Sequence, residues 1–250
     1  MKKIIYIIAL LSVFTCDNAD VPDCFQAAGE IIQVEYDLNG FDKITVLQRS
    51  QLIVSEGQFS VTLETGENLE NDISVFVNAN GRLIIDNENA CNISRDYGIT
   101  KVFVSAPNVT EIRNASGLEV LSVGVLSYPN LLLISEDLEE EEDAFNTNGD
   151  FRLDLDVQNL KIIQNNLSNF FLTGNVTNLD INFLFGDGRF EGRNLSVENT
   201  TLFHRGTNDI ILNPQNSLTG SILSTGDVRI TNTPTVLNVE ELYTGRLIVE

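Results

Sequence analysis

Short segments in which every second residue is apolar recur along the chain. Residues 59–64 read Phe-Ser-Val-Thr-Leu-Glu, and residues 151–158 alternate Phe, Leu, Leu and Val with Arg, Asp, Asp and Gln. Residues 179–185 repeat the pattern with Leu, Ile, Phe and Phe. A period of two puts one face of a strand in a core and the other in water. After the N-terminal apolar run, no segment keeps the 3.6-residue period of a helix, so the pattern predicts an all-β fold without long helices.

Turn signals separate these segments. Asn39-Gly40, Asn80-Gly81 and Asn148-Gly149 are dipeptides that accept positive φ. Asn80-Gly81 lies between the apolar segments 73–77 and 83–85. We therefore predict a hairpin there, and an N-terminal part of the domain that is more hairpin-like than the rest.

The second half of the chain shows a loose repeat. Asn-Leu pairs begin at residues 159, 178 and 194, and glycines stand at 206, 226 and 245. A period near 20 residues is typical of a β-solenoid, in which each coil buries its apolar face only by stacking on its neighbours. The alternative is a β-sandwich, whose strands recur every 8–12 residues.

The N-terminus has the pattern of an export signal. Lys2 and Lys3 precede an apolar run over 4–14, which is too short to span a bilayer as a helix. The run ends at Cys16, and polar residues follow. This arrangement resembles a bacterial lipoprotein signal, so we expect 1–15 to be a signal peptide, Cys16 to carry lipid and 16–33 to be a tether. The alternative is an ordinary secretory signal cleaved nearby.

The remaining cysteines are Cys24 and Cys91. An exported protein meets an oxidising compartment, which favours a disulfide between them. The alternative is a pair of unpaired thiols. Two cysteines so far apart in sequence, without histidines, do not indicate a metal site.

Composition and charge narrow the function. The chain has 250 residues, 42% of them hydrophobic, which suffices for a substantial core. Its net charge of −21 opposes binding to nucleic acid phosphates, so we exclude nucleic acid as a partner. Seven acids occur within residues 136–143. Packed strands do not tolerate that density of like charge, so we predict an exposed loop over 136–148. The run lacks the glycine and spacing of an EF-hand, so we assign no Ca²⁺ site.

Candidate chemistry is sparse. The single histidine, His204, has no nucleophile motif around it, and we expect it at a turn or facing solvent. Four aspartates at or near turns fit backbone capping, because Asp bonds to nearby amides. The alternative is a polysaccharide lyase, which would need a basic cluster beside them. The residues concerned are Asp150, Asp187, Asp209 and Asp227, with Arg189, Arg193 and Arg205. We assign no catalytic, cofactor or metal residues.

The ordered succession of segments resembles a known family. Residues 41–46 resemble its opening strand, 81–85 its hairpin return and 102–107 its strand ending in Ala-Pro, while Gly149-Asp150 and Gly226-Asp227 are similar to its repeated turns. The family is the putative auto-transporter adhesin, head GIN domain family of exported bacterial proteins. The resemblance implies a right-handed parallel β-helix and an envelope location, and it says little about ligand.

These observations lead to one expectation. We expect residues 34–250 to form a right-handed, single-stranded parallel β-helix that is held at the membrane by lipid on Cys16. Its function would be non-catalytic adhesion or binding of a glycan or protein ligand, outside the cell or in the periplasm. The alternatives are a polysaccharide lyase or hydrolase on the same scaffold, and a structural or stress-sensing envelope protein.

Overall fold

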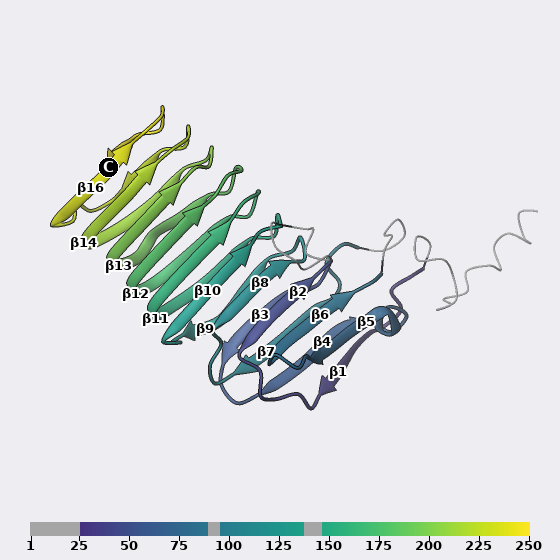
Figure 1. Ribbon diagram of the computed structural model, residues 1–250. Coiled ribbons are helices and arrows are strands. Elements are labelled where there is room, and N and C mark those ends of the chain that lie inside the picture. Colours follow the sequence, from purple (N-terminus) through teal and green to yellow (C-terminus); the bar gives the residue numbers. More distant parts are fainter. Residues whose placement is uncertain (1–25, 90–95, 138–146) are drawn as a thin grey trace, which may run out of the picture.

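The computed structural model describes residues 26–89, 96–137 and 147–250. Within these ranges the chain forms 17 strands joined in one mixed sheet, and the only helical element is a 3-10 turn at Glu70–Asp72. The all-β prediction is confirmed. Figure 1 shows the strands side by side in an elongated stack, from β1 at the N-terminal end to β16 at the other.

The elements of the first part are β1 (Ile31–Tyr36), β2 (Lys43–Leu47), β3 (Gln51–Glu56), β4 (Ser60–Gly66), β5 (Ile73–Val77), β6 (Arg82–Asn87), β7 (Lys101–Ala106), β8 (Glu111–Ala115), β9 (Val120–Leu126) and β10 (Asn130–Ser135). The second part holds β11 (Phe151–Gln164), β12 (Phe170–Phe183), β13 (Phe190–His204), β14 (Ile210–Ile222), β15 (Val228–Ile230), β16 (Val236–Glu241) and β17 (Leu247–Val249).

The long strands of the second part pair in parallel. Phe151 of β11 lies opposite Phe170 of β12, 19 positions later, and Phe170 lies opposite Phe190 of β13, 20 positions later. The sequence period near 20 is therefore the distance from one strand to its hydrogen-bonded neighbour. Such parallel pairing differs from the antiparallel sheets of the β-sandwich alternative.

The pairings form two ladders. One runs through β5, β6, β2, β8, β10 and the second halves of β11 to β14, and ends at β16. The other runs through β1, β4, β7, β3, β9 and the first halves of β11 to β14, and ends at β15 and β17. We call them the first and the second ladder. The long strands β11 to β14 contribute to both.

Chain order and spatial order differ in the first part. β2 lies between β6 and β8, and β3 lies between β7 and β9, all in parallel. The chain thus builds the layer of β2 and β3 first and then β6 and β7 on one side. It crosses back to place β8 and β9 on the other side (Figure 1).

Antiparallel strands occupy the N-terminal end of the stack. β5 and β6 form the predicted hairpin, and at its turn Asn78 Oδ1 accepts hydrogen bonds from the amides of Asn80 and Arg82. Gly81 has a φ of 69° and Gly40 a φ of 74°, as their Asn-Gly dipeptides predict, whereas Gly149 does not have a positive φ. The sheet is mixed rather than uniformly parallel because of this end, where β4 also pairs antiparallel with β1 and β7.

One continuous apolar core lies between the ladders. Inward side chains at every second position stack on those of the next strand, as in Phe151 and Phe170, whose rings are 4.8 Å apart and nearly parallel. Phe170 also lies 5.8 Å from Phe183, which comes from the first ladder. Burial of each large side chain stabilises the fold by about 1.5–3 kcal/mol, so stacking adjacent strands compensates for the small apolar surface of each.

Two details of the predicted pattern are wrong. Asn178 lies opposite Asn199, so the Asn-Leu pair at 194 is not the structural equivalent of the pair at 178. Phe185 continues the alternation of β12, yet the strand ends at Phe183 and Phe185 is 43% exposed at the following turn. The first strand begins at residue 31, inside the segment 16–33 expected as tether, and Gln26 is already buried.

Candidate ligand groove

A groove of about 470 Å³ crosses the outer face of the second ladder. Side chains from β3, β9, β11, β12 and β13 line it, so it runs along the stack rather than along a single strand. Its size is within the range of ligand sites in proteins. The sequence gives no direct signal for it, since its residues come from five separated segments.

Two β-bulges border the groove on one side. Against β11, β9 advances four residues (121 to 125) while its partner advances two (152 to 154). Against β14, β13 advances five residues (191 to 196) while its partner advances two (211 to 213). The extra residues protrude because they have no ladder partner. Val123 on the first bulge is 63% exposed, and Arg193 and Asn194 come from the second.

The floor of the groove is largely apolar, with one charged residue in its outward row. This row consists of Ile53 on β3, Leu121 on β9, Arg152 on β11 and Phe171 on β12. The guanidinium of Arg152 lies over the Phe171 ring, 4.3 Å from its centre, and Arg152 Nε donates to Glu119 Oε1 at 2.9 Å. A cation over an aromatic ring at an exposed site contributes about 0.5–1 kcal/mol.

Polar groups on the floor are held by neighbouring strands. Ser122 Oγ accepts a hydrogen bond from the Asp154 amide at 2.9 Å. Thr173 Oγ1 donates to Asp154 Oδ1 at 3.2 Å. These contacts link β9, β11 and β12 across the groove, so its hydroxyl and carboxylate groups are positioned before any ligand arrives.

An ionic network borders the groove on its C-terminal side. Arg193 donates to Glu250 at 2.6 Å and lies 3.8 Å from Glu191, which also pairs with Arg189 at 3.0 Å. The hydrogen bond from Arg193 lowers the pKa of Glu250. The remaining members are Asp209, Asp227 and Arg229. The network neutralises much of the charge on this face of a strongly acidic protein.

A second groove, of about 360 Å³, follows the first ladder. Its border is a ladder of amides in which Asn159 donates to Asn130 and Asn178 donates to Asn159, both at 2.9 Å. Asn199 continues the series at 3.2 Å, and Asn216 follows. Because each amide is already bonded along the stack, its first role is structural.

The sequence predicts His204 at a turn or facing solvent; it is the last residue of β13, beside the turn, but it is buried and does not face solvent. The parallel register places it between Phe183 of β12 and Ile222 of β14, in one column of inward-facing side chains. Burial lowers its pKa to about 4. Its Nδ1 accepts the Gly206 amide at 3.4 Å, just as Gln164 Oε1 accepts the Asn166 amide at 2.9 Å in the same column.

Two of the four turn aspartates cap backbone groups, as predicted, but on the neighbouring strand. Asp150 Oδ1 accepts the Asn169 amide at 2.8 Å, and Asp227 Oδ1 accepts the Arg246 amide at 2.9 Å. The lyase alternative depends on convergence of Asp187, Asp209 and Arg205. Asp187 instead bonds Thr207 at 2.6 Å, Asp209 bonds Arg229 at 2.9 Å, and Arg205 is exposed. None of the three lines the groove of the second ladder.

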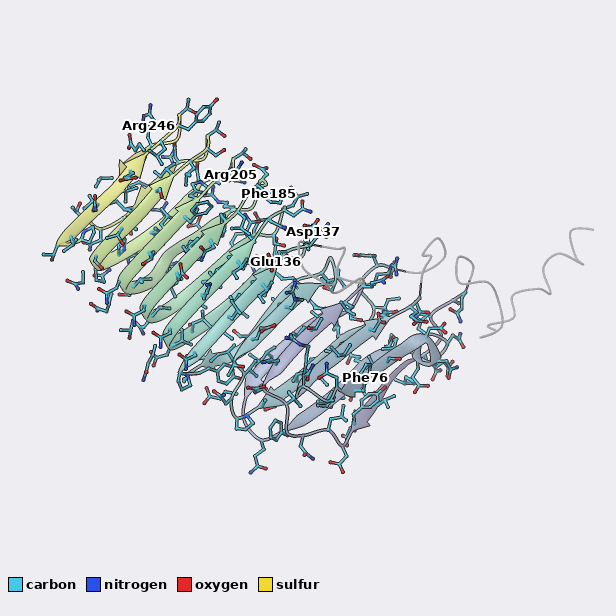
Figure 2. All side chains as sticks on the ribbon, in the orientation of Figure 1. Phe76, Glu136, Asp137, Phe185, Arg205 and Arg246 are labelled. Carbon is cyan, nitrogen blue, oxygen red and sulfur yellow. The ribbon has the colours of Figure 1, made fainter. Side chains whose placement is uncertain are left out.

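Arg205 lies along one margin of the stack with Phe185 and Arg246 (Figure 2). Among the described residues no group of three or more potential metal ligands occurs.

The predicted acidic loop starts later than residue 136. Glu136 is buried, with a carboxylate 3.8 Å from the Arg113 guanidinium, and Asp137 Oδ1 accepts from Asn165 at 2.7 Å (Figure 2). Thr147 is buried as well. An opposite charge allows Glu136 inside the fold and a hydrogen bond from Asn166 allows Thr147 there, whereas Asp137 is exposed. The rest of the acidic run lies outside the described residues, as do Cys16, Cys24 and Cys91.

Comparison with known proteins gives one family and several related folds. The model of the family described as "Putative auto-transporter adhesin, head GIN domain" matches residues 40–234. No curated protein matches the chain. In the described part of the chain, none of the helical structure has the length and apolar character needed to cross a bilayer.

Three solved structures share the fold at low identity. A putative adhesin from Bacteroides fragilis has a TM-score of 0.77 and 17% identity, covering 90% of this chain and 99% of its own. A putative lipid binding protein from Parabacteroides distasonis has a TM-score of 0.63 and 11% identity, with coverages of 88% and 97%. A putative adhesin from Parabacteroides merdae has a TM-score of 0.56 and 14% identity, with the same coverages.

Proposed function

This chain belongs to the putative auto-transporter adhesin, head GIN domain family, and from that premise we propose that it is a non-catalytic binding module of the bacterial cell envelope. The observation that carries the proposal is the groove bordered by the bulges of β9 and β13. It is preformed, it spans five strands, and it combines an apolar floor with fixed polar groups. Such a surface suits an extended glycan or protein ligand.

The elongated stack also favours presentation of that surface. The parallel register between β11, β12 and β13 supports a right-handed parallel β-helix as the architecture of residues 34–250. Stacking of this kind makes long, rigid faces from short repeats. A rigid face holds a groove in the same shape whether or not a ligand is bound.

Attachment to the membrane is the second part of the proposal. The sequence of residues 1–16 supports removal of a signal peptide over 1–15 and lipidation of Cys16. The segment after Cys16 then tethers the domain, and a disulfide between Cys24 and Cys91 would tie this tether to it. Mass measurement of the N-terminus after expression in a lipoprotein-processing host tests the anchor, and an unmodified terminus would refute it.

A binding screen tests the function itself. The purified full chain is applied to arrays of envelope glycans and to immobilised envelope proteins, with heat-unfolded chain as the control. We expect saturable binding to at least one class of polymer that the unfolded chain does not retain. Uniformly blank arrays would contradict the binding function and favour a structural role.

The lyase alternative predicts a different result. It requires loss of polymer length during incubation, and it needs acidic and basic groups that converge. Asp187 and Asp209 bond to different partners on this scaffold and lie outside the groove, so the groups on which the lyase alternative depends do not converge there. Unchanged polymer length after prolonged incubation is the expected outcome.

A further inference from the structure

We infer that the groove beside the two bulges is a site for an uncharged, extended oligosaccharide that lies along the stack axis. The inference rests on the proposed binding function and specifies its ligand. It is drawn from three properties of the groove: its length, the chemistry of its floor and border, and its charge balance.

The length of the groove fits a chain of several sugar units. Its lining comes from five consecutive strands of the second ladder. Neighbouring strands lie about 4.8 Å apart, so five of them span roughly 19 Å. The bulges of β9 and β13 come directly after Leu121 and Glu191 of the outward row, so both border the path of the ligand on the same side.

The chemistry of the groove matches a sugar ring, which has apolar C–H faces and hydroxyl edges. Leu121 and the Arg152 guanidinium, which is stacked on Phe171, form a flat floor on which such faces can lie. Thr173 and Asp154 provide hydroxyl and carboxylate groups beside it, and Asn194 adds an amide from the second bulge. An acyl chain would remove Asp154 and Asn194 from water without offering them hydrogen bonds in return, which costs binding energy.

The charge balance of the groove favours a neutral ligand. The protein as a whole carries −21, yet Arg152 and Arg193 face Asp154 and Glu191 within the groove. Both arginines are already paired, Arg152 with Glu119 at 2.9 Å and Arg193 with Glu250 at 2.6 Å. An anionic polymer would have to displace these carboxylates, and the surrounding acidic surface would repel it.

Titration calorimetry with defined oligosaccharides tests the inference. The full chain is titrated with neutral oligosaccharides, with a polyuronate and with anionic lipid vesicles, beside the variants Phe171→Ala and Arg193→Ala. Phe185→Ala and Arg205→Ala are matched controls, since both residues are exposed at turns outside the groove. Thermal unfolding of every variant checks that its fold is retained.

The expected result is binding of a neutral oligosaccharide that Phe171→Ala weakens roughly tenfold and Phe185→Ala leaves unchanged. Binding of only the polyuronate, the vesicles or a protein would overturn the inference and leave the binding function standing. Neutral-sugar binding that survives both groove substitutions would also overturn it, because the site would then lie elsewhere. If nothing binds in calorimetry and every array is blank, the proposed function itself fails.

Discussion

Phe170 lies against Phe151 of the preceding strand with ring centres 4.8 Å apart and planes only 6° from parallel. The two residues are 19 positions apart in the chain, so the contact joins equivalent positions of two successive repeats. Phe170 also contacts Phe183 across the core, so the same ring joins the two ladders.

Phe170→Ala should therefore destabilise the fold strongly. Removing a fully buried ring leaves a cavity between two strands, and we expect a loss of about 3–5 kcal/mol in the free energy of unfolding. Chemical denaturation measures it. Phe185→Ala is the matched control, because that ring is 43% exposed, and it should change stability by no more than about 0.5 kcal/mol. Equal effects of the two substitutions would contradict the stacked core.

The free energy of unfolding should decrease as the pH is lowered, because of His204. Burial lowers its pKa from 6.5 to about 4, so the unfolded chain takes up a proton that the folded chain rejects. The contribution of neutral His204 is complete above about pH 6.5 and is lost as the pH falls to about 4. The shift corresponds to about 3 kcal/mol.

His204→Gln tests this pH dependence. Glutamine already occupies the equivalent position of the column at Gln164, where it accepts the same type of amide hydrogen bond. The variant should show a flatter dependence of unfolding free energy on pH between 6.5 and 4. If wild type and variant have the same slope in denaturation curves, His204 does not make this contribution.

Gly220→Ala should be more harmful than Gly40→Ala. Both glycines have positive φ, 142° and 74° respectively, so both substitutions strain the backbone by about 1 kcal/mol or more. A Cβ on Gly220 would also overlap the carbonyl oxygen of Leu202 on the neighbouring strand, whereas Gly40 has nothing within 4 Å. We therefore expect Gly220→Ala to have the lower melting temperature of the two variants. Equal melting temperatures would contradict the close approach of the backbone at Gly220.

The amide ladder should contribute modestly to stability. Asn178 donates to Asn159 and accepts from Asn199, so Asn178→Ala removes two exposed hydrogen bonds. We expect a loss of about 1 kcal/mol in urea denaturation. Asn175→Ala, an exposed position on the same strand, is the control and should stay within about 0.5 kcal/mol of wild type. A larger effect at Asn175 would show that the ladder is not stabilising.

Local signals in the sequence predicted local structure well. The dipeptide Asn80-Gly81 between two apolar segments was sufficient for the hairpin of β5 and β6, because a turn of this type depends on a few adjacent residues. The alternation over 151–158 predicted the inward and outward faces of β11 for the same reason.

The environment of His204 could not be predicted in this way. Its own neighbours offer no sign of burial, and only the strand register places it between Phe183 and Ile222. The groove was missed for a related reason. Glycines at 124 and 192 mark the two bulges, but an extra residue becomes a bulge only when the partner strand is shorter at that point.

The sequence by itself determined the kind of strand, the hairpin turn and the period near 20, since each depends on the order of residues along a few turns or one repeat. Only the tertiary structure decided which strands adjoin. The insertion of β2 between β6 and β8 joins segments far apart in the chain, and the bulges of β9 and β13 border the groove on the same side with two other strands between them. The groove exists because packing brought these segments together. Hydrophobic burial drives that packing, but it is non-directional, so the apolar pattern of a strand does not specify which other strand it packs beside.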